Sequence, residues 1–373
     1  MVNSQQRFVI LDPRRTKRQW VEVTLAPLGS LHWFRLPFFA LRLTPKARAA
    51  AKTARAMSKH RNWSNIRKRL TERLLAHYYA GTFAYFAKNP DAIAVCWNGL
   101  NGARHIFMQS AKDAGARTLF YELAPLAGRI TIDPRGVNQA NSLPRDIAPY
   151  LSWAQSNPAP DRSWHDLKRD ITQRARTTVR DANTQPLPLT APFVFVALQT
   201  PGDSQLRLYG GAFKTVESFV GACIKAAAHL PDGWHMRIKE HPTAPTDFAA
   251  KFDGQTSARV FFDNTTDTFE QVAASRAVIT VNSSVGLEAM MFEKPVVACG
   301  EAFWNIHGVA HSAPDAQSVA NTCAIADHLE IDADARSAFL DFLDQAYYPR
   351  KTGDAALIQA RLNGPDSFGF WRT

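Results

Sequence analysis

Cysteine and long apolar runs are both scarce in this sequence. Its four cysteines lie far apart and form no Cys-x-x-Cys pair, which argues against a disulfide framework or a zinc site and for buried free thiols in a reducing compartment. No N-terminal stretch joins a basic start to an apolar core, and the most apolar early segment, residues 31–43, is broken by Arg35 and Arg42. We therefore expect a cytoplasmic protein that does not span a membrane.

Glycine-rich nucleotide-binding motifs are absent as well. Neither a Walker A sequence nor Gly-x-Gly-x-x-Gly occurs, so the NTPase and dinucleotide-binding classes lose their main support. The chain is nevertheless ordinary in composition, with 46% hydrophobic and 21% charged residues, which indicates a folded protein. Its 373 residues exceed the ~250 to 300 at which a single core stops growing, so two domains are expected.

Acidic residues are scarce near the N-terminus. Residues 1–80 carry 17 Lys and Arg against three Asp and Glu, whereas the rest of the chain carries 27 against 30, so the whole excess of +11 is N-terminal. Between residues 46 and 73 the basic residues alternate with Ala, Leu and aromatic residues, which predicts one or two basic helices. Such a surface attracts an anionic membrane leaflet, and a solvated helical face is the alternative. No nucleic-acid-binding pattern accompanies it, so we expect no nucleic-acid partner.

Short apolar runs separated by helical segments predict an α/β fold with two Rossmann-type domains. A strand at 92–97, a helix at 101–114 and a strand at 118–123 form the first unit of a parallel sheet. The pattern starts again after a proline-rich connection at 185–192. Further predicted elements are strands at 193–198, 235–239, 260–262, 277–281 and 295–298 and a helix at 216–229. We divide the chain into an N-terminal domain at 1–185, a C-terminal domain at 186–345 and a tail at 346–373 that packs back on the N-terminal domain.

Polar clusters follow four of these strands, at the sheet edge where α/β proteins bind ligands. Taken singly, each has a structural explanation: a solvated strand-end carboxylate, a turn with an aspartate helix cap, a loop histidine and a serine-capped helix. Together the last three predict a nucleotide site, because hydroxyls and helical N–H groups bind phosphate beside a cation and a histidine. The clusters contain Glu122; Gln199 and Asp203; Lys239, His241 and Pro242; and Asn282, Ser283, Ser284, Gly286 and Glu288.

Two further polar patterns are typical of local structure. Asp332-Ala333-Asp334 fits a metal-binding pattern, but it lies where a helix begins, so we interpret it as a helix cap and expect no metal site. Asp133-Pro134-Arg135-Gly136 has the composition of a turn.

The ordered combination of motifs resembles the bacterial capsular polysaccharide biosynthesis family of retaining β-Kdo glycosyltransferases, which use CMP-Kdo. The resemblance covers roughly residues 90–310 and rests on FYELAPLAGRITIDPRGVN, FVALQTPGDSQ, KEHP and NSSVGLEAMMFEKPVVACG. It implies a GT-B-like architecture, in which two Rossmann-type domains face each other across a cleft. The C-terminal domain would hold the CMP-sugar and the N-terminal domain the acceptor.

The resemblance also implies roles for single residues. His241, Ser283 and Ser284 would bind the CMP moiety, and His241 would also assist catalysis. We hypothesise that Asp203 is the nucleophile and that Glu122 is the general base for the acceptor hydroxyl. The remaining donor-site candidates are Gln199, Lys239, Pro242, Asn282, Gly286 and Glu288, and no cofactor is required.

Two other functions stay open at this point. One is a transferase for a different CMP-activated acid sugar, such as sialic acid, and the other is a non-catalytic basic protein that binds polysaccharide or nucleic acid. We expect the acceptor to be a glycolipid or oligosaccharide in capsule or related surface polysaccharide synthesis. The basic segment at 46–73 would then hold the protein peripherally at the inner face of the inner membrane.

Overall fold

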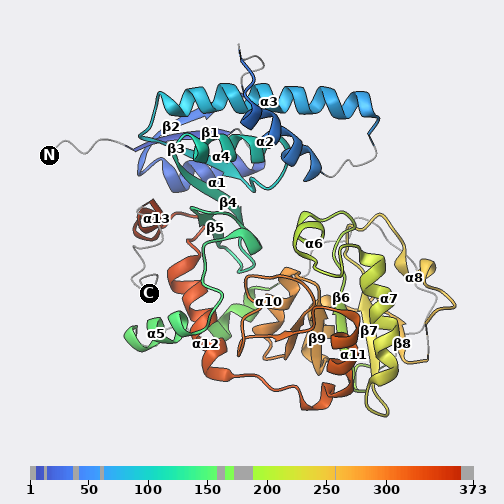
Figure 1. The fold of residues 1–373 in the computed structure, drawn as a ribbon. Coiled ribbons are helices and arrows are strands. Elements are labelled where there is room, and N and C mark those ends of the chain that lie inside the picture. Colours follow the sequence, from blue (N-terminus) through green and yellow to red (C-terminus); the bar gives the residue numbers. More distant parts are fainter. Residues whose placement is uncertain are drawn as a thin grey trace. The chain divides into compact units, whose positions relative to one another are not determined.

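A computed structural model describes residues 6–11, 15–36, 42–58, 63–157, 164–171, 188–256 and 258–362. These residues divide into an N-terminal unit, within Met1–Ala124, Gly128–Leu143 and Asp344–Thr373, and a C-terminal unit, within Pro125–Ala127 and Pro144–Leu343. Each unit is built around its own sheet (Figure 1). The prediction of an α/β chain with two sheets rich in parallel strands is confirmed, whereas the predicted boundary at residue 185 lies outside the described residues.

The N-terminal unit has a mixed five-stranded sheet in the order β2-β1-β3-β4-β5, in which only β5 is antiparallel. One face packs on α1 and α13, and the other packs on α3 and α4. Helix α2 lies against α3 and α4. The elements are β1 (Gln6–Leu11), α1 (Arg15–Leu25), β2 (Gly29–Phe34), α2 (Pro45–Ala56), α3 (Asn65–Ala87), β3 (Ala92–Trp97), α4 (Gly102–Asp113), β4 (Arg117–Leu123), β5 (Ile130–Asp133), the 3-10 turn η1 (Asn138–Ala140) and α13 (Ala355–Leu362).

The predicted basic segment and the described part of the predicted tail both belong to this unit. Two helices, α2 and α3, form where one or two were expected between residues 46 and 73. In the described part of the tail, Ile358 and Leu362 are buried in the same core as Phe8 and Val95. The π-helical turn η5 (Leu343–Tyr347) leads into this tail.

The C-terminal unit has a parallel sheet in the order β11-β10-β9-β6-β7-β8. All five residues of β6 are buried, as expected for a central parallel strand. The elements are α5 (Ala148–Ser156), η2 (Trp164–Asp170), β6 (Phe193–Ala197), α6 (Ser204–Tyr209), α7 (Val216–Ala226), η3 (Ala227–His229), β7 (His235–Lys239), α8 (Phe248–Lys251), β8 (Val260–Phe262), α9 (Thr268–Ala274), β9 (Ala277–Thr280), α10 (Ser284–Met290), β10 (Val296–Ala298), β11 (His311–Ser312), α11 (Ala316–Ala324), η4 (Ala326–His328) and α12 (Ala333–Phe342).

Local chemistry explains where α12 begins. Asp332 caps α12 by accepting a hydrogen bond from the Ala335 N–H at 2.9 Å, so the capping interpretation of that motif is confirmed. The four cysteines are buried and free, as the spacing predicted. None of the described helices combines the length and hydropathy needed to cross a bilayer.

Candidate active site

The predicted donor-site residues of the C-terminal unit follow three adjacent strands. Strand β6 pairs with β7 on one side and with β9 on the other, because the chain runs from β6 through β7 to β8 and then crosses back to β9 on the opposite side of β6. Such a reversal creates a crevice at the carboxyl ends of the two strands, which is where open α/β sheets bind ligands. The residues that follow β6 and β9 begin at these carboxyl ends and carry the Gln199–Asp203 and Asn282–Ser284 motifs.

A pair of amides joins these two loops. Gln199 Nε2 donates to Asn282 Oδ1 at 2.9 Å, and the Asn282 backbone N–H donates to Gln199 Oε1 at 3.3 Å. Asn282 Nδ2 also donates to the backbone carbonyls of Gln205 at 3.1 Å and Glu301 at 3.2 Å. Gln199 and Asn282 therefore hold the two site loops together, and their predicted contact with the donor stays a prediction.

Asp203 is held in place by a tight turn and by its own helix. Pro201 and Gly202 occupy the central positions of a turn closed by the hydrogen bond from Asp203 N–H to Thr200 O at 3.0 Å. Gly202 has φ +75°, the left-handed value that a type II turn requires at this position. Asp203 Oδ1 then caps α6 by accepting from the Gln205 N–H at 2.8 Å. This bond fixes the carboxylate, and its other oxygen, Oδ2, has no hydrogen-bond partner among the described residues.

His241 lies in a turn that orients its ring. The Ala244 N–H donates to His241 O at 2.9 Å, with Pro242 at the second position of the turn. The Thr243 N–H donates to His241 Nδ1 at 3.2 Å, and the Thr243 hydroxyl lies 2.9 Å from the same atom. Because Nδ1 accepts from the backbone, the proton of the neutral ring is on Nε2.

Lys239 and Glu240 have structural partners beside this histidine. Lys239 is only 4% exposed, and its ammonium donates to the backbone carbonyls of Asn264, at 3.4 Å, and Thr266. Glu240 Oε1 accepts from the N–H groups of Phe248 and Ala249, both at 2.8 Å. Lys239 thus holds the loop after β8, and its predicted contact with a phosphate stays a prediction.

The serine motif forms the start of α10. Ser283 caps the helix by accepting from the Val285 N–H at 3.3 Å, and Ser284 is its first residue. The position that a Cβ of Gly286 would occupy lies 2.6 Å from two ring carbons of Trp304, so glycine is needed here for packing. Glu288 is a half-buried residue one turn further along the helix. The predicted roles of these residues in phosphate and ribose binding stay predictions.

Glu122 belongs to the N-terminal unit, at the carboxyl end of β4. Trp97 Nε1 and the Leu123 N–H both donate to its Oε1 at 3.0 Å, and Asn98 Nδ2 donates to its Oε2 at 2.8 Å. Asn98 has φ +67°, and Trp97 is the last residue of the neighbouring strand β3. The sequence analysis predicted neither Trp97 nor Asn98 as a partner of Glu122.

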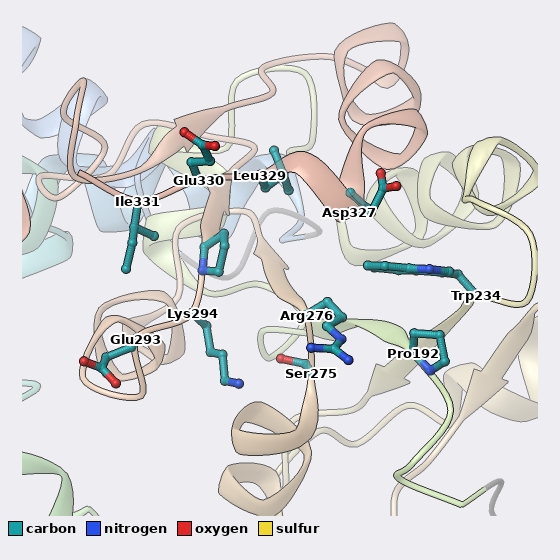
Figure 2. Close-up of a pocket in the computed structure, with 12 residues that line it drawn as sticks. Pro192, Trp234, Ser275, Arg276, Glu293, Lys294, Asp327, Leu329, Glu330 and Ile331 are labelled. Carbon is teal, nitrogen blue, oxygen red and sulfur yellow. The ribbon is translucent and has the colours of Figure 1, made fainter. Parts of the chain in front are cut away.

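A separate pocket of about 770 Å³ lies at the opposite edge of the C-terminal sheet. Its lining includes Pro192, Trp234 and Arg276, the residues that directly precede β6, β7 and β9 (Figure 2). None of the predicted site residues lines this pocket. The motifs and the pocket therefore mark opposite edges of one sheet.

Comparison with known proteins agrees with the family resemblance. Residues 163–327 match the capsule polysaccharide biosynthesis protein family. The matched segment spans less than half of the chain. It contains the Gln199–Asp203, Lys239–Pro242 and Asn282–Glu288 motifs, whereas Glu122 lies before it.

Single proteins that resemble this chain share a third or less of their aligned residues with it. Protein FixF of Sinorhizobium fredii (strain NBRC 101917 / NGR234) is 32% identical over 257 residues, which are 68% of this chain and 60% of FixF, so the chain spans less than two thirds of this relative. The β-Kdo 2,4 transferase of Thermosulfurimonas dismutans KpsC aligns at 16% identity and a TM-score of 0.48, covering 89% of this chain and 90% of its own. The β-Kdo 2,7 transferase of the same protein aligns at 11% identity and a TM-score of 0.47, covering 86% and 89%.

Proposed function

We propose that the protein is a glycosyltransferase that moves Kdo from CMP-Kdo to a glycolipid or oligosaccharide acceptor, with retention, in the synthesis of a capsule or related surface polysaccharide. The observation that carries this proposal is the joining of the Gln199–Asp203 and Asn282–Ser284 loops at the strand reversal of the C-terminal sheet. The family match of residues 163–327 supports a role in polysaccharide synthesis. The motif resemblance supports the choice of donor.

The first displacement transfers the sugar to the enzyme. Asp203 Oδ2 attacks the anomeric carbon, the bond from that carbon to the CMP oxygen breaks, and its electron pair leaves with CMP. His241 Nε2–H and the hydroxyls of Ser283 and Ser284 donate to the departing phosphate, which gains negative charge as the bond breaks. The product is a Kdo ester of Asp203.

The second displacement transfers the sugar to the acceptor. Glu122 takes the proton of the acceptor hydroxyl, whose oxygen attacks the anomeric carbon, and the electron pair of the broken ester bond returns to Asp203. Glu122 Oε2 accepts one hydrogen bond, from Asn98, which leaves this oxygen a lone pair for the proton. Two displacements at one carbon restore its original configuration.

Mass spectrometry of the intact protein incubated with CMP-Kdo tests the proposal. We expect a sugar-sized mass increase on the peptide that contains Asp203 and no increase in D203N, because asparagine retains the helix cap but is a poor nucleophile. D267N is the matched control, since Asp267 caps α9 through the N–H groups of Phe269 and Glu270. We expect D267N to form the adduct, and EDTA to leave its yield unchanged.

The outcomes separate the parts of the proposal. Normal turnover by D203N, or an adduct on another peptide, contradicts the nucleophile assignment alone. A preference for CMP-sialic acid over CMP-Kdo in a competition assay contradicts the choice of sugar. Failure to bind CMP, with no effect of changing His241, contradicts the transferase assignment as a whole.

A further inference from the structure

Helix α3 presents an apolar stripe to solvent. Ile66, Leu70 and Leu74 are 73%, 63% and 39% exposed, and their spacing of four residues places them on one face of the helix. The opposite face carries Leu75, which packs in a core shared with α2 and α4. The stripe therefore makes no contribution to the core, although its side chains are as apolar as those that do.

Basic side chains border the stripe on both sides. At about 100° per residue, Arg69 and Arg73 project on one side of it and Arg67 on the other, and all three are exposed. The acidic residue within this stretch, Glu72, is paired with Arg55 of α2. The exposed surface of the first turns of α3 thus combines apolar groups with an excess of positive charge.

We propose that the first three turns of α3 dock on an anionic lipid bilayer, with Ile66, Leu70 and Leu74 inserted at the boundary of headgroups and acyl chains. A helix that lies in a bilayer surface needs an apolar face bordered by Lys and Arg, which contact lipid phosphates. Charge complementarity favours this occupant over a second copy of the chain, because two such faces in contact would bring their arginines together. This proposal identifies which residues of the basic segment would contact the lipid. It does not depend on the proposed transfer reaction.

Flotation of the protein with lipid vesicles tests the docking. We expect binding to vesicles of phosphatidylcholine with phosphatidylglycerol, little binding to phosphatidylcholine alone, and weakening by 0.5 M NaCl. The triple variant I66S/L70S/L74S keeps all charges and is expected to lose at least about tenfold in partitioning, since it removes the inserted apolar surface. R67Q/R69Q/R73Q keeps the stripe and is expected to lose on the order of a hundredfold at low salt.

A single exposed isoleucine elsewhere supplies the matched control. Ile325 in the C-terminal unit is 51% exposed, and I325S is expected to bind vesicles as the wild type does. Equal binding by the wild type and I66S/L70S/L74S, with far-UV circular dichroism showing both folded, would overturn the proposal. The proposal would also be overturned if the wild-type protein did not bind vesicles but formed a dimer that the triple variant does not form, because a second copy would then cover the stripe.

Discussion

Asn98 combines an unusual backbone conformation with a contact to a candidate catalytic group. Its φ is +67°, and its side-chain amide donates to Glu122 Oε2 at 2.8 Å. We predict that N98G and N98A both lower kcat about tenfold or more, because Glu122 loses the donor that orients it. Only N98A should also lose about 1 kcal/mol of unfolding free energy, because alanine is strained at positive φ and glycine is not.

Steady-state kinetics with urea unfolding of the same preparations separates the two effects. If N98G keeps wild-type kcat, Asn98 serves the backbone alone and does not position Glu122. If N98A is as stable as N98G, the left-handed conformation is not retained in the variant.

At the scale of elements, Gly286 and Trp304 control how closely α10 approaches the rest of its unit. A Cβ at Gly286 would lie 2.6 Å from the indole, and Trp304 is only 1% exposed, so the ring has little room to move. We predict that G286A loses about 2 kcal/mol of unfolding free energy and weakens the proposed binding of CMP, because the first turn of α10 must shift. G221A is the control, since nothing lies within 4 Å of that Cβ position in α7, and it should be neutral or slightly stabilising.

A double-mutant cycle with the smaller side chain in W304F checks the cause of that loss. The two changes should be less than additive, because phenylalanine makes room for the new methyl group. Simple additivity, as measured by chemical denaturation, would show that G286A acts through something other than the indole.

Some strands can be predicted from the sequence and others cannot. The strands at 92–97, 235–239 and 260–262 were predicted at their observed bounds. The first and the third are compact apolar runs between polar neighbours, and 235–239 alternates Met236 and Ile238 with polar residues. Strands β1 and β2 were missed. In β2 the buried ends flank exposed and half-buried residues, so β2 makes no apolar run. Strand β1 does contain one, residues 8–11, which was not assigned to a strand.

Part of the candidate site could also be predicted from the sequence. The polar motifs in the loops after the predicted strands were recognised as site candidates, because parallel strands place their carboxyl ends at one edge of the sheet. The hydrogen bond between Gln199 and Asn282 could not be predicted, because it depends on β9 lying beside β6 and 83 residues separate the partners. Contacts of Glu122 with Trp97 and of Gly286 with Trp304 likewise require the strand order and the packing of rings, which no local spacing reports.

At the scale of the whole molecule, a buried histidine makes stability depend on pH. His235 is 4% exposed at the start of β7, its ring lies between those of Phe193 and Phe261, and Arg237 Nε donates to its Nε2 at 3.0 Å. Burial and the neighbouring Arg237 charge lower the pKa of His235 to about 4. The unfolded chain, with an ordinary histidine pKa of about 6.5, therefore binds the proton more readily between these two values.

We predict that the unfolding free energy of the C-terminal unit is highest above pH 6.5 and falls by about 2 kcal/mol as the pH is lowered from 7 to 4.5. H235Q should flatten this decline, because glutamine keeps an acceptor for Arg237 but binds no proton. H229Q, which replaces an exposed histidine of the same unit, should retain it. Urea unfolding at a series of pH values measures the slopes, and a wild-type slope in H235Q would assign the pH dependence to other groups.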